Sequence, residues 1–469
     1  MSRKNLQHIT LKFTEAPALD NQNKVGCASG DITVESTYTE TDLEDVHHLD
    51  FAAGIPPYLR GISSTMYVTS PWDMCQYSPL NSIETFNSFL KYQFEVGQRE
   101  FLINCSTKNK FIPETLEDFK AIFKDIPLQD ISVFFNTNEY LLPLLACYTT
   151  TAESHGLESK KLKGGFIIDV FSDLKTLKTT KNSRLDALIF SNTYLPYFNR
   201  ISISAVSLQS QVITPEIELA LMLISGNNQI QKAMDSGLKI DDIAPRISFT
   251  FSIGLHHFSE IAKLRAVRLL WAKIVKSYHP KNDRSLALHI HSHTYTNQSS
   301  DHDISHSVTK STIAAASAIF GGSQSLDTYS NKNSTPELKQ LNNHTQWYLR
   351  EETQITKTID PWGGSFYVEK RTHDIAQQAW SIFKDYKTSG KLPERLITEL
   401  SQYELDFSKT ETSVQNSNIS TINRDESAVK HALLKLTDAR HSLDENVLTL
   451  AINAFKNQAT YSEIYKAIN

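Results

Sequence analysis

The sequence is poor in cysteine and in long apolar runs. Only four cysteines occur in 469 residues, and none of them forms a C-x-x-C pair. So few cysteines in a chain of this length indicate a reducing compartment without a disulfide framework, and we expect a cytoplasmic protein. No apolar run approaches 18 residues and the first residues carry no apolar signal segment, so we expect neither a membrane span nor secretion.

An excess of basic charge is also missing. Lys and Arg total 47 against 52 Asp and Glu, which gives a net charge of -5 and argues against a nucleic-acid partner. Gly and Pro are scarce at 16 and 15, while 40 % of the residues are hydrophobic. The composition therefore predicts a folded chain with a sizeable core and excludes disorder as its general state.

Short strand-like runs alternate with helical patterns along most of the chain. No G-x-G-x-x-G, P-loop or G-x-S-x-G motif occurs. The alternative fold, an open doubly wound sheet, therefore lacks the glycine-rich phosphate-binding turn that is usual in it. Eight repeats of strand and helix predict an α/β fold, the (β/α)₈ TIM barrel. The expected strands are 101–105, 131–137, 165–170, 201–207, 247–253, 287–293, 323–329 and 355–359.

Composition divides the chain into four parts. Residues 1–60 are polar and form an expected N-terminal arm, and residues 61–400 form the expected barrel. Residues 401–428 are rich in Ser, Thr, Asn and acids, as linkers are. Residues 429–469 contain short amphipathic helices, which we expect to pack on the barrel or on a partner.

Several expected strands carry small polar side chains on one face. Ser202 and Ser204 lie on one strand, and Ser248, Thr250 and Ser252 lie on the next. Such faces either line a channel for a threaded ligand or point at the helix layer, where buried water satisfies them. His289, His291 and His293 continue the pattern and suggest zinc, but same-face neighbours on a strand lie about 7 Å apart, so at most two could share one ion. We therefore assign no metal site.

The segment 54–61 reads G-I-P-P-Y-L-R-G, and T-M-Y and P-W-D-M-C-Q-Y follow at 65–67 and 71–77. This block resembles the methylmalonyl-CoA mutase family. The resemblance continues in order through further segments of the chain. These are 126–133, 201–207, 243–254, 261–275, 323–328 and 359–369. It implies a barrel whose centre takes the coenzyme A tail, and a reaction that interconverts methylmalonyl-CoA and succinyl-CoA by radicals from adenosylcobalamin.

Two parts of the machinery that the resemblance implies are missing. The D-x-H-x-x-G signature of the cobalamin-binding domain does not occur, so we expect no such domain in this chain. The family motif G-Y-H-M-Q-E reads A-V-S-L-Q-S at 205–210, which puts Ser207 at the position of the catalytic His and leaves no catalytic residue.

The substrate and cofactor positions implied by the resemblance are partly retained. Met66, Tyr77, His291 and Ser292 match substrate-binding positions, and Gln324 and Glu352 match retained positions that we assign to the cofactor side; we regard all six as vestigial. Ser63, Ser70, Asp73, Cys75 and His289 replace a Tyr, an Arg, a Thr and two further Arg. Phe134 replaces a small strand residue, and we expect it to narrow the channel.

These losses, beside intact strand and helix signals, predict the small, non-catalytic subunit of a methylmalonyl-CoA mutase heterodimer. Adenosylcobalamin would then be held by the large subunit, with none on this chain alone. One alternative is an active barrel that uses a separate cobalamin-binding polypeptide, with His289 or His293 replacing the missing groups. The other is a metal-dependent hydrolase built on the His-rich strand.

Overall fold

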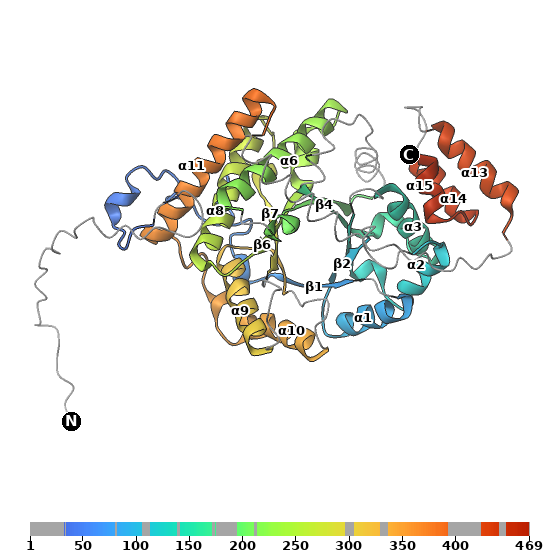
Figure 1. Ribbon diagram of the computed structural model, residues 1–469, viewed down its shortest axis with the longest axis horizontal. Helices are drawn as coiled ribbons and strands as arrows, with labels where there is room; N and C mark the ends of the chain where they lie inside the picture. The colour runs from blue at the N-terminus through green and yellow to red at the C-terminus, as the bar shows by residue number, and fades with distance from the viewer. Residues whose placement is uncertain are drawn as a thin grey trace, which may run out of the picture.

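The computed structural model describes residues 32, 34–79, 82–105, 113–137, 141–170, 174, 195–210, 213–295, 304–328, 336–392, 424–439 and 447–468. Eight parallel strands in this part of the chain close into a barrel in sequential order, and helices surround it (Figure 1). The predicted (β/α)₈ architecture is confirmed. The strands are β1 (Asp73–Pro79), β2 (Glu100–Asn104), β3 (Ser132–Asn136), β4 (Lys163–Asp169), β5 (Phe198–Ser204), β6 (Ile247–Ile253), β7 (His289–Thr294) and β8 (Ser325–Asp327).

Two of the strand predictions need correction. The first strand is β1, which the sequence pattern missed because D-M-C-Q-Y-S-P has no β-branched residue and ends in proline. Residues 355–359 are not a strand: Ile355–Lys357 form a 3₁₀ turn that follows Gln354, whose φ is 57°. The number of strands was right, but β1 was not expected and the last expected strand, 355–359, was wrong.

Helices alternate with the strands and begin at recognisable caps. At α2 (Leu116–Ile122) the Thr115 hydroxyl accepts a hydrogen bond from the Asp118 backbone N–H, while the Asp118 carboxylate accepts one from the Thr115 N–H. In α8 (His257–Lys276) an apolar stripe is buried against the barrel, and it consists of Leu264, Val267, Trp271, Ile274 and Val275. The other barrel helices are α1 (Ile83–Glu95), α3 (Leu141–Ser154), α6 (Pro215–Asp235), α9 (Ile304–Phe320) and α10 (Pro336–Glu351).

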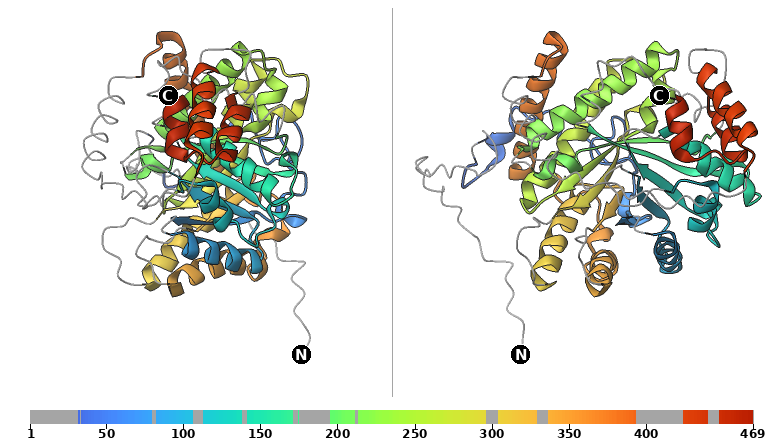
Figure 2. Two further views of the ribbon diagram at one scale, coloured as in Figure 1. Left: turned by 90° about the vertical axis from the view of Figure 1, so that its right-hand side faces the viewer. Right: turned by 45° about the vertical axis from the view of Figure 1, so that its right-hand side comes forward.

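Two additions cover opposite flanks of the barrel. The long helix α11 (Phe366–Ser389) packs on α8 and α6, and the arm residues of the 3₁₀ turn Glu40–Leu43 pack on α11 in turn (Figure 1). On the other flank lies a helical layer that packs on α3 of the barrel (Figure 2). It consists of α13 (Glu426–Ala439), α14 (Val447–Lys456) and α15 (Tyr461–Ile468). The C-terminal helices therefore pack on the barrel itself. Most of the expected linker 401–428 lies outside the described residues.

The apolar core has three separate parts. One lies between the strands and α6, α8 and α11, and a second lies beneath α1–α3 and the C-terminal helices. The third consists of Cys75, Leu102, Phe134 and Ile167, one residue from each of β1 to β4. Because side chains alternate along a strand, these four point away from the helix layer and into the bore of the barrel.

Candidate functional site

The bore of the barrel is half apolar and half polar. Cys75, Leu102, Phe134 and Ile167 fill the side formed by β1–β4, and each is at most 8 % exposed. The polar side is formed by serine, threonine and histidine from β5–β8. Its members are Ser202, Ser248, Thr250, His291 and Ser325. Of the two interpretations of the hydroxyl faces, the one that points them into the bore is correct.

The polar groups of the bore bind each other across neighbouring strands. The hydroxyls of Ser202 and Thr250 lie 2.7 Å apart, and His291 Nδ1 lies 2.7 Å from Ser325 Oγ. Burial lowers the pKa of His291 to about 4, so this imidazole is neutral at pH 7. Each of these polar groups has a partner from the chain itself.

Little space is left between these side chains. The cavity that they enclose with Phe134 and Arg200 measures about 20 Å³, which is room for about one water molecule. Sites for molecules the size of a coenzyme typically measure about 300–1,000 Å³. In this conformation the described part of the bore therefore does not admit a pantetheine chain.

A charged cluster lies at the amino end of the strands. Arg200 Nη1 is 3.8 Å from Glu100 Oε1 and 3.4 Å from His289 Nε2. Burial raises the pKa of Glu100 and lowers that of His289 well below its usual value, and the charge of Arg200 lowers both. The Cys75 thiol donates a hydrogen bond to Glu100, with Sγ and Oε2 3.3 Å apart, and burial raises the thiol pKa. This thiol is therefore a protonated, inert group and no nucleophile.

Ser207 lies at the opposite, carboxyl end, in the 3₁₀ turn Val206–Ser210 after β5. Its hydroxyl donates a hydrogen bond to Asp169 Oδ1 from the end of β4. A second pair lies at the carboxyl end of β7 and β8, where His293 Nδ1 is 2.7 Å from Asp327 Oδ2. Active sites of TIM barrels form at this end, so these two pairs are its candidate chemical groups.

The remaining sequence-derived site residues are scattered. Ser292 points away from the bore, because it alternates with His291 and His293, and its hydroxyl lies 2.6 Å from that of Ser323. Gln324 precedes β8, at the amino end of the barrel: it accepts from the Ile290 N–H at 2.9 Å and donates to the Gly322 carbonyl at 2.8 Å. Glu352 is exposed after α10, and the side chain of Tyr77 lies outside the described residues.

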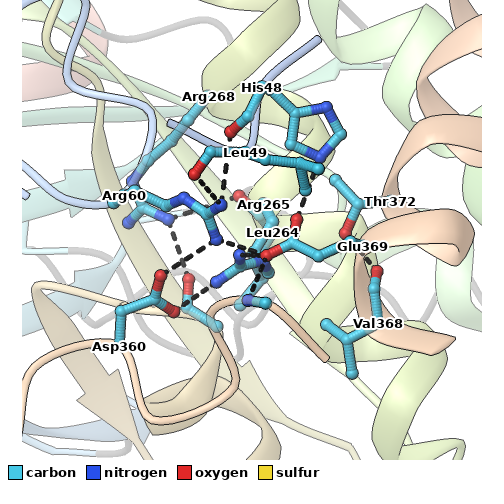
Figure 3. A network of polar contacts seen from close by, with 12 residues as sticks. His48, Leu49, Arg60, Leu264, Arg265, Arg268, Asp360, Val368, Glu369 and Thr372 are labelled. Carbon is cyan, nitrogen blue, oxygen red and sulfur yellow. Dashed lines mark hydrogen bonds and ion pairs between the residues drawn. The ribbon is translucent and has the colours of Figure 1, made fainter. Parts of the chain in front are cut away.

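A buried ionic network, which the sequence analysis missed, fixes the loop that carries the G-I-P-P-Y-L-R-G motif (Figure 3). Arg60 Nη1 binds Glu369 Oε1 at 2.5 Å and Asp360 Oδ2 at 3.1 Å, and Arg265 binds the same two carboxylates. His48 Nε2 lies 3.0 Å from Glu369 Oε2. These partners are between 95 and 321 residues apart in sequence, so no local pattern could have shown them.

The same loop seats the retained methionine. Gly54 and Gly61 have φ values of 73° and 144°, and a Cβ on Gly61 would lie 2.3 Å from Met66 Sδ. Met66 is buried, and the neighbouring Tyr67 hydroxyl donates to the Ser323 carbonyl at 2.6 Å. Met66 thus packs against this loop, and it is not among the residues that line the bore cavity.

The part of the chain that the structure describes contains no cluster of three or more His, Cys, Asp or Glu placed to hold a metal ion. His291 and His293 contact Ser325 and Asp327. None of the helices described is long and apolar enough to cross a bilayer.

Comparison with known sequences identifies the family of this chain. A sequence model of the family described as "Methylmalonyl-CoA mutase" matches residues 28–109 and 113–418. The chain belongs to the methylmalonyl-CoA mutase family. It is 32 % identical to the methylmalonyl-CoA mutase large subunit of Porphyromonas gingivalis, over 93 % of this chain and 70 % of the relative.

Two further relatives show the same level of similarity. The methylmalonyl-CoA mutase large subunit of Propionibacterium freudenreichii is 29 % identical, over 97 % of this chain and 73 % of the relative. The human mitochondrial methylmalonyl-CoA mutase is also 29 % identical, over 93 % of this chain and 67 % of the relative. The family match at residues 28–109 and 113–418 includes all eight described strands of the barrel.

Proposed function

We propose that this chain is a non-catalytic subunit of a methylmalonyl-CoA mutase, which assembles with a catalytic, cobalamin-carrying chain of the same family. The observation that carries the proposal is the filled bore. A cavity of about 20 Å³ between Phe134, Leu102 and Ile167 on one side and His291 on the other does not accommodate an acyl-CoA tail.

The chemistry at the carboxyl end supports the same conclusion. A catalytic imidazole can exchange a proton near neutral pH, since its ordinary pKa is about 6.5. Ser207 has only a hydroxyl group, which does not titrate in that range, and this hydroxyl already donates to Asp169. The chain thus lacks the proton-transfer group at the position where the family pattern has a histidine.

The charges at the amino end support it too. Binding of coenzyme A phosphates benefits from arginines, because charge-assisted hydrogen bonds contribute about 1.5–3 kcal/mol each. Ser70 and Cys75 stand where the family pattern has arginines, and Asp73 adds an acid to the Glu100 cluster. The remaining cation of this cluster, Arg200, is engaged by Glu100 and His289.

The family depends on adenosylcobalamin, but the groups described here do not fit a role in holding it. At the carboxyl end, Ser207 and His293 are paired with Asp169 and Asp327, and the D-x-H-x-x-G sequence does not occur in these 469 residues. We therefore derive no reaction step through the cofactor, and assign its binding to the partner. A cytoplasmic location for the complex stays a prediction from the cysteine content.

The test is to purify the chain alone and together with a catalytic mutase chain, and to measure the mass and turnover of each preparation. We expect a heterodimer whose turnover with methylmalonyl-CoA and adenosylcobalamin belongs to the partner, and no turnover by this chain alone. A partner that runs as a separate species, or turnover by the isolated chain, would contradict the proposal.

One observation favours a second function. The His293–Asp327 pair is an imidazole oriented by a carboxylate at the active end of the barrel, as in general-base catalysis. If this pair replaced the missing histidine, the chain would be an active barrel that works with a separate cobalamin-binding polypeptide. Turnover after addition of an isolated cobalamin-binding domain, abolished by His293→Asn, would establish this function in place of the first.

A further inference from the structure

A cleft on the outside of the barrel is much larger than the cavity in the bore. It measures about 340 Å³ and lies between the end of α1, the end of α10 and the start of β1. It reaches Cys75 of the bore wall, but none of its lining residues lines the bore cavity, whose volume is about 20 Å³. Its volume falls in the range of about 300–1,000 Å³ that is usual for small-molecule sites.

Aromatic and apolar side chains form one wall and the rim of this cleft. The rings of Trp347 and Tyr348 on α10 meet edge to face, with centroids 5.6 Å apart. They are 44 % and 55 % exposed, and Val96 at the end of α1 is 52 % exposed. Large apolar groups left open to water around a hollow are costly unless something covers them.

Carboxamides, together with the imidazole of His344, supply the polar part of the lining. Gln346 accepts from Trp72 Nε1 at 3.0 Å and donates to Thr328 Oγ1 at 3.1 Å, which fixes the amide and uses one of its two N–H groups. Gln98 donates one N–H to the Glu100 carbonyl at 2.6 Å. Each amide has further donor and acceptor capacity beyond these bonds.

No Lys, Arg, Asp or Glu lines the cleft. A charged ligand would therefore lose water without meeting a permanently charged partner, whereas a neutral ring would stack on Trp347 and exchange hydrogen bonds with an amide or with the imidazole of His344. We propose that this cleft binds a neutral, planar heteroaromatic group that offers both a donor and an acceptor, such as a nucleobase or a nicotinamide. The inference does not depend on the proposed subunit function.

The test uses adenosine as the probe on the chain of 469 residues, with affinity measured by calorimetry and the total tryptophan emission followed in parallel. We expect a Kd below about 1 mM, together with quenching of tryptophan emission. Nicotinamide, which is neutral, should bind at least tenfold more tightly than nicotinate, which has the same ring and a negative charge.

Variants locate the site. Trp347→Ala should weaken adenosine binding at least tenfold, and Val96→Arg, which brings a charge and a long side chain to the rim, should do the same. Leu341→Ala is the matched control, because Leu341 is an exposed residue of the same helix that does not line the cleft. No binding of adenosine or nicotinamide at 5 mM, equal binding of nicotinate, or an undiminished affinity in either cleft variant would overturn the proposal.

Discussion

The guanidinium of Arg200 lies over the ring of Phe134 inside the barrel, with its carbon 5.5 Å from the ring centroid. One residue comes from β5 and the other from β3, and only β4 separates these strands in the barrel. Phe134 is 6 % exposed and belongs to the apolar half of the bore, whereas Arg200 belongs to the charged cluster at the amino end. Their contact joins the two halves and closes the space that a channel would need.

Removing the Phe134 ring should open the bore at a cost in stability. Phe134→Ala should lower the free energy of unfolding by about 3–5 kcal/mol, because a buried ring is lost and its neighbours relax only partly. Denaturant unfolding measures this change. Phe366→Ala, at a phenylalanine that is 41 % exposed, is the control and should cost less than about 1 kcal/mol. Equal effects of the two substitutions would mean that Phe134 does not pack the bore.

Restoring the imidazole alone should not restore catalysis. In Ser207→His the side chain regains a group that can transfer protons, but the bore remains filled by Phe134 and its neighbours. We expect no measurable isomerisation of methylmalonyl-CoA by this variant with adenosylcobalamin, with or without an added cobalamin-binding domain. Turnover in this assay would show that the identity of residue 207 was the decisive loss and that the bore does admit substrate.

His291 should make the protein less stable in acid. Its pKa is lowered from 6.5 to about 4 in the fold, so between these values the unfolded chain binds a proton that the folded chain does not. Stability therefore falls as the pH drops from 6.5 towards 4, and about 2–3 kcal/mol is lost to this residue by pH 4.5. Unfolding at pH 7 and pH 4.5 measures it.

The variant His291→Gln separates this residue from the other acid-sensitive groups. The loss of stability between pH 7 and pH 4.5 should be about 2–3 kcal/mol smaller in the variant than in the unchanged protein. A loss of the same size in both proteins would mean that His291 is protonated at pH 4.5 in the folded state or is not buried.

The ionic network of Figure 3 should be a strong determinant of stability. Glu369→Ala removes one of the two carboxylates that Arg60 and Arg265 share, which leaves both buried arginines with Asp360 alone, and should cost about 3–5 kcal/mol. Asp125→Asn removes the exposed Lys91–Asp125 pair and, as the control, should cost at most about 1 kcal/mol. Thermal or denaturant unfolding distinguishes them, and a cost for Glu369→Ala no larger than the control would contradict the network's role.

Sequence reasoning identified much of this arrangement because it rests on local pattern. The alternation of Ser202, Thr250 and His291 with apolar neighbours predicted a polar strand face, and the structure confirms it. The sequence pattern did not predict strand β1, because its residues have weak strand preference. The strand forms through backbone pairing with β2 and β8.

Other features depend on contacts between distant residues. The partners of His291 and His293 are Ser325 and Asp327, each 34 residues away on the next strand. The register between β7 and β8 sets these pairs, and this register cannot be read from one sequence alone. The same holds for Arg60 and Glu369, which are 309 residues apart. Phe134 was expected to narrow the channel. How far the bore is filled depends on Phe134 together with one apolar residue from each of β1, β2 and β4.

Calorimetric titration of coenzyme A into the isolated chain tests the central claim most directly, because it asks whether the barrel takes the ligand without asking for catalysis. A bore filled by Phe134, Leu102 and Ile167 predicts that coenzyme A at concentrations up to 1 mM shows no binding beyond that of adenosine, which the cleft beside β1 accounts for. Saturable binding with a micromolar Kd, weakened by a bulky substitution at Ser202 in the bore wall, would contradict it.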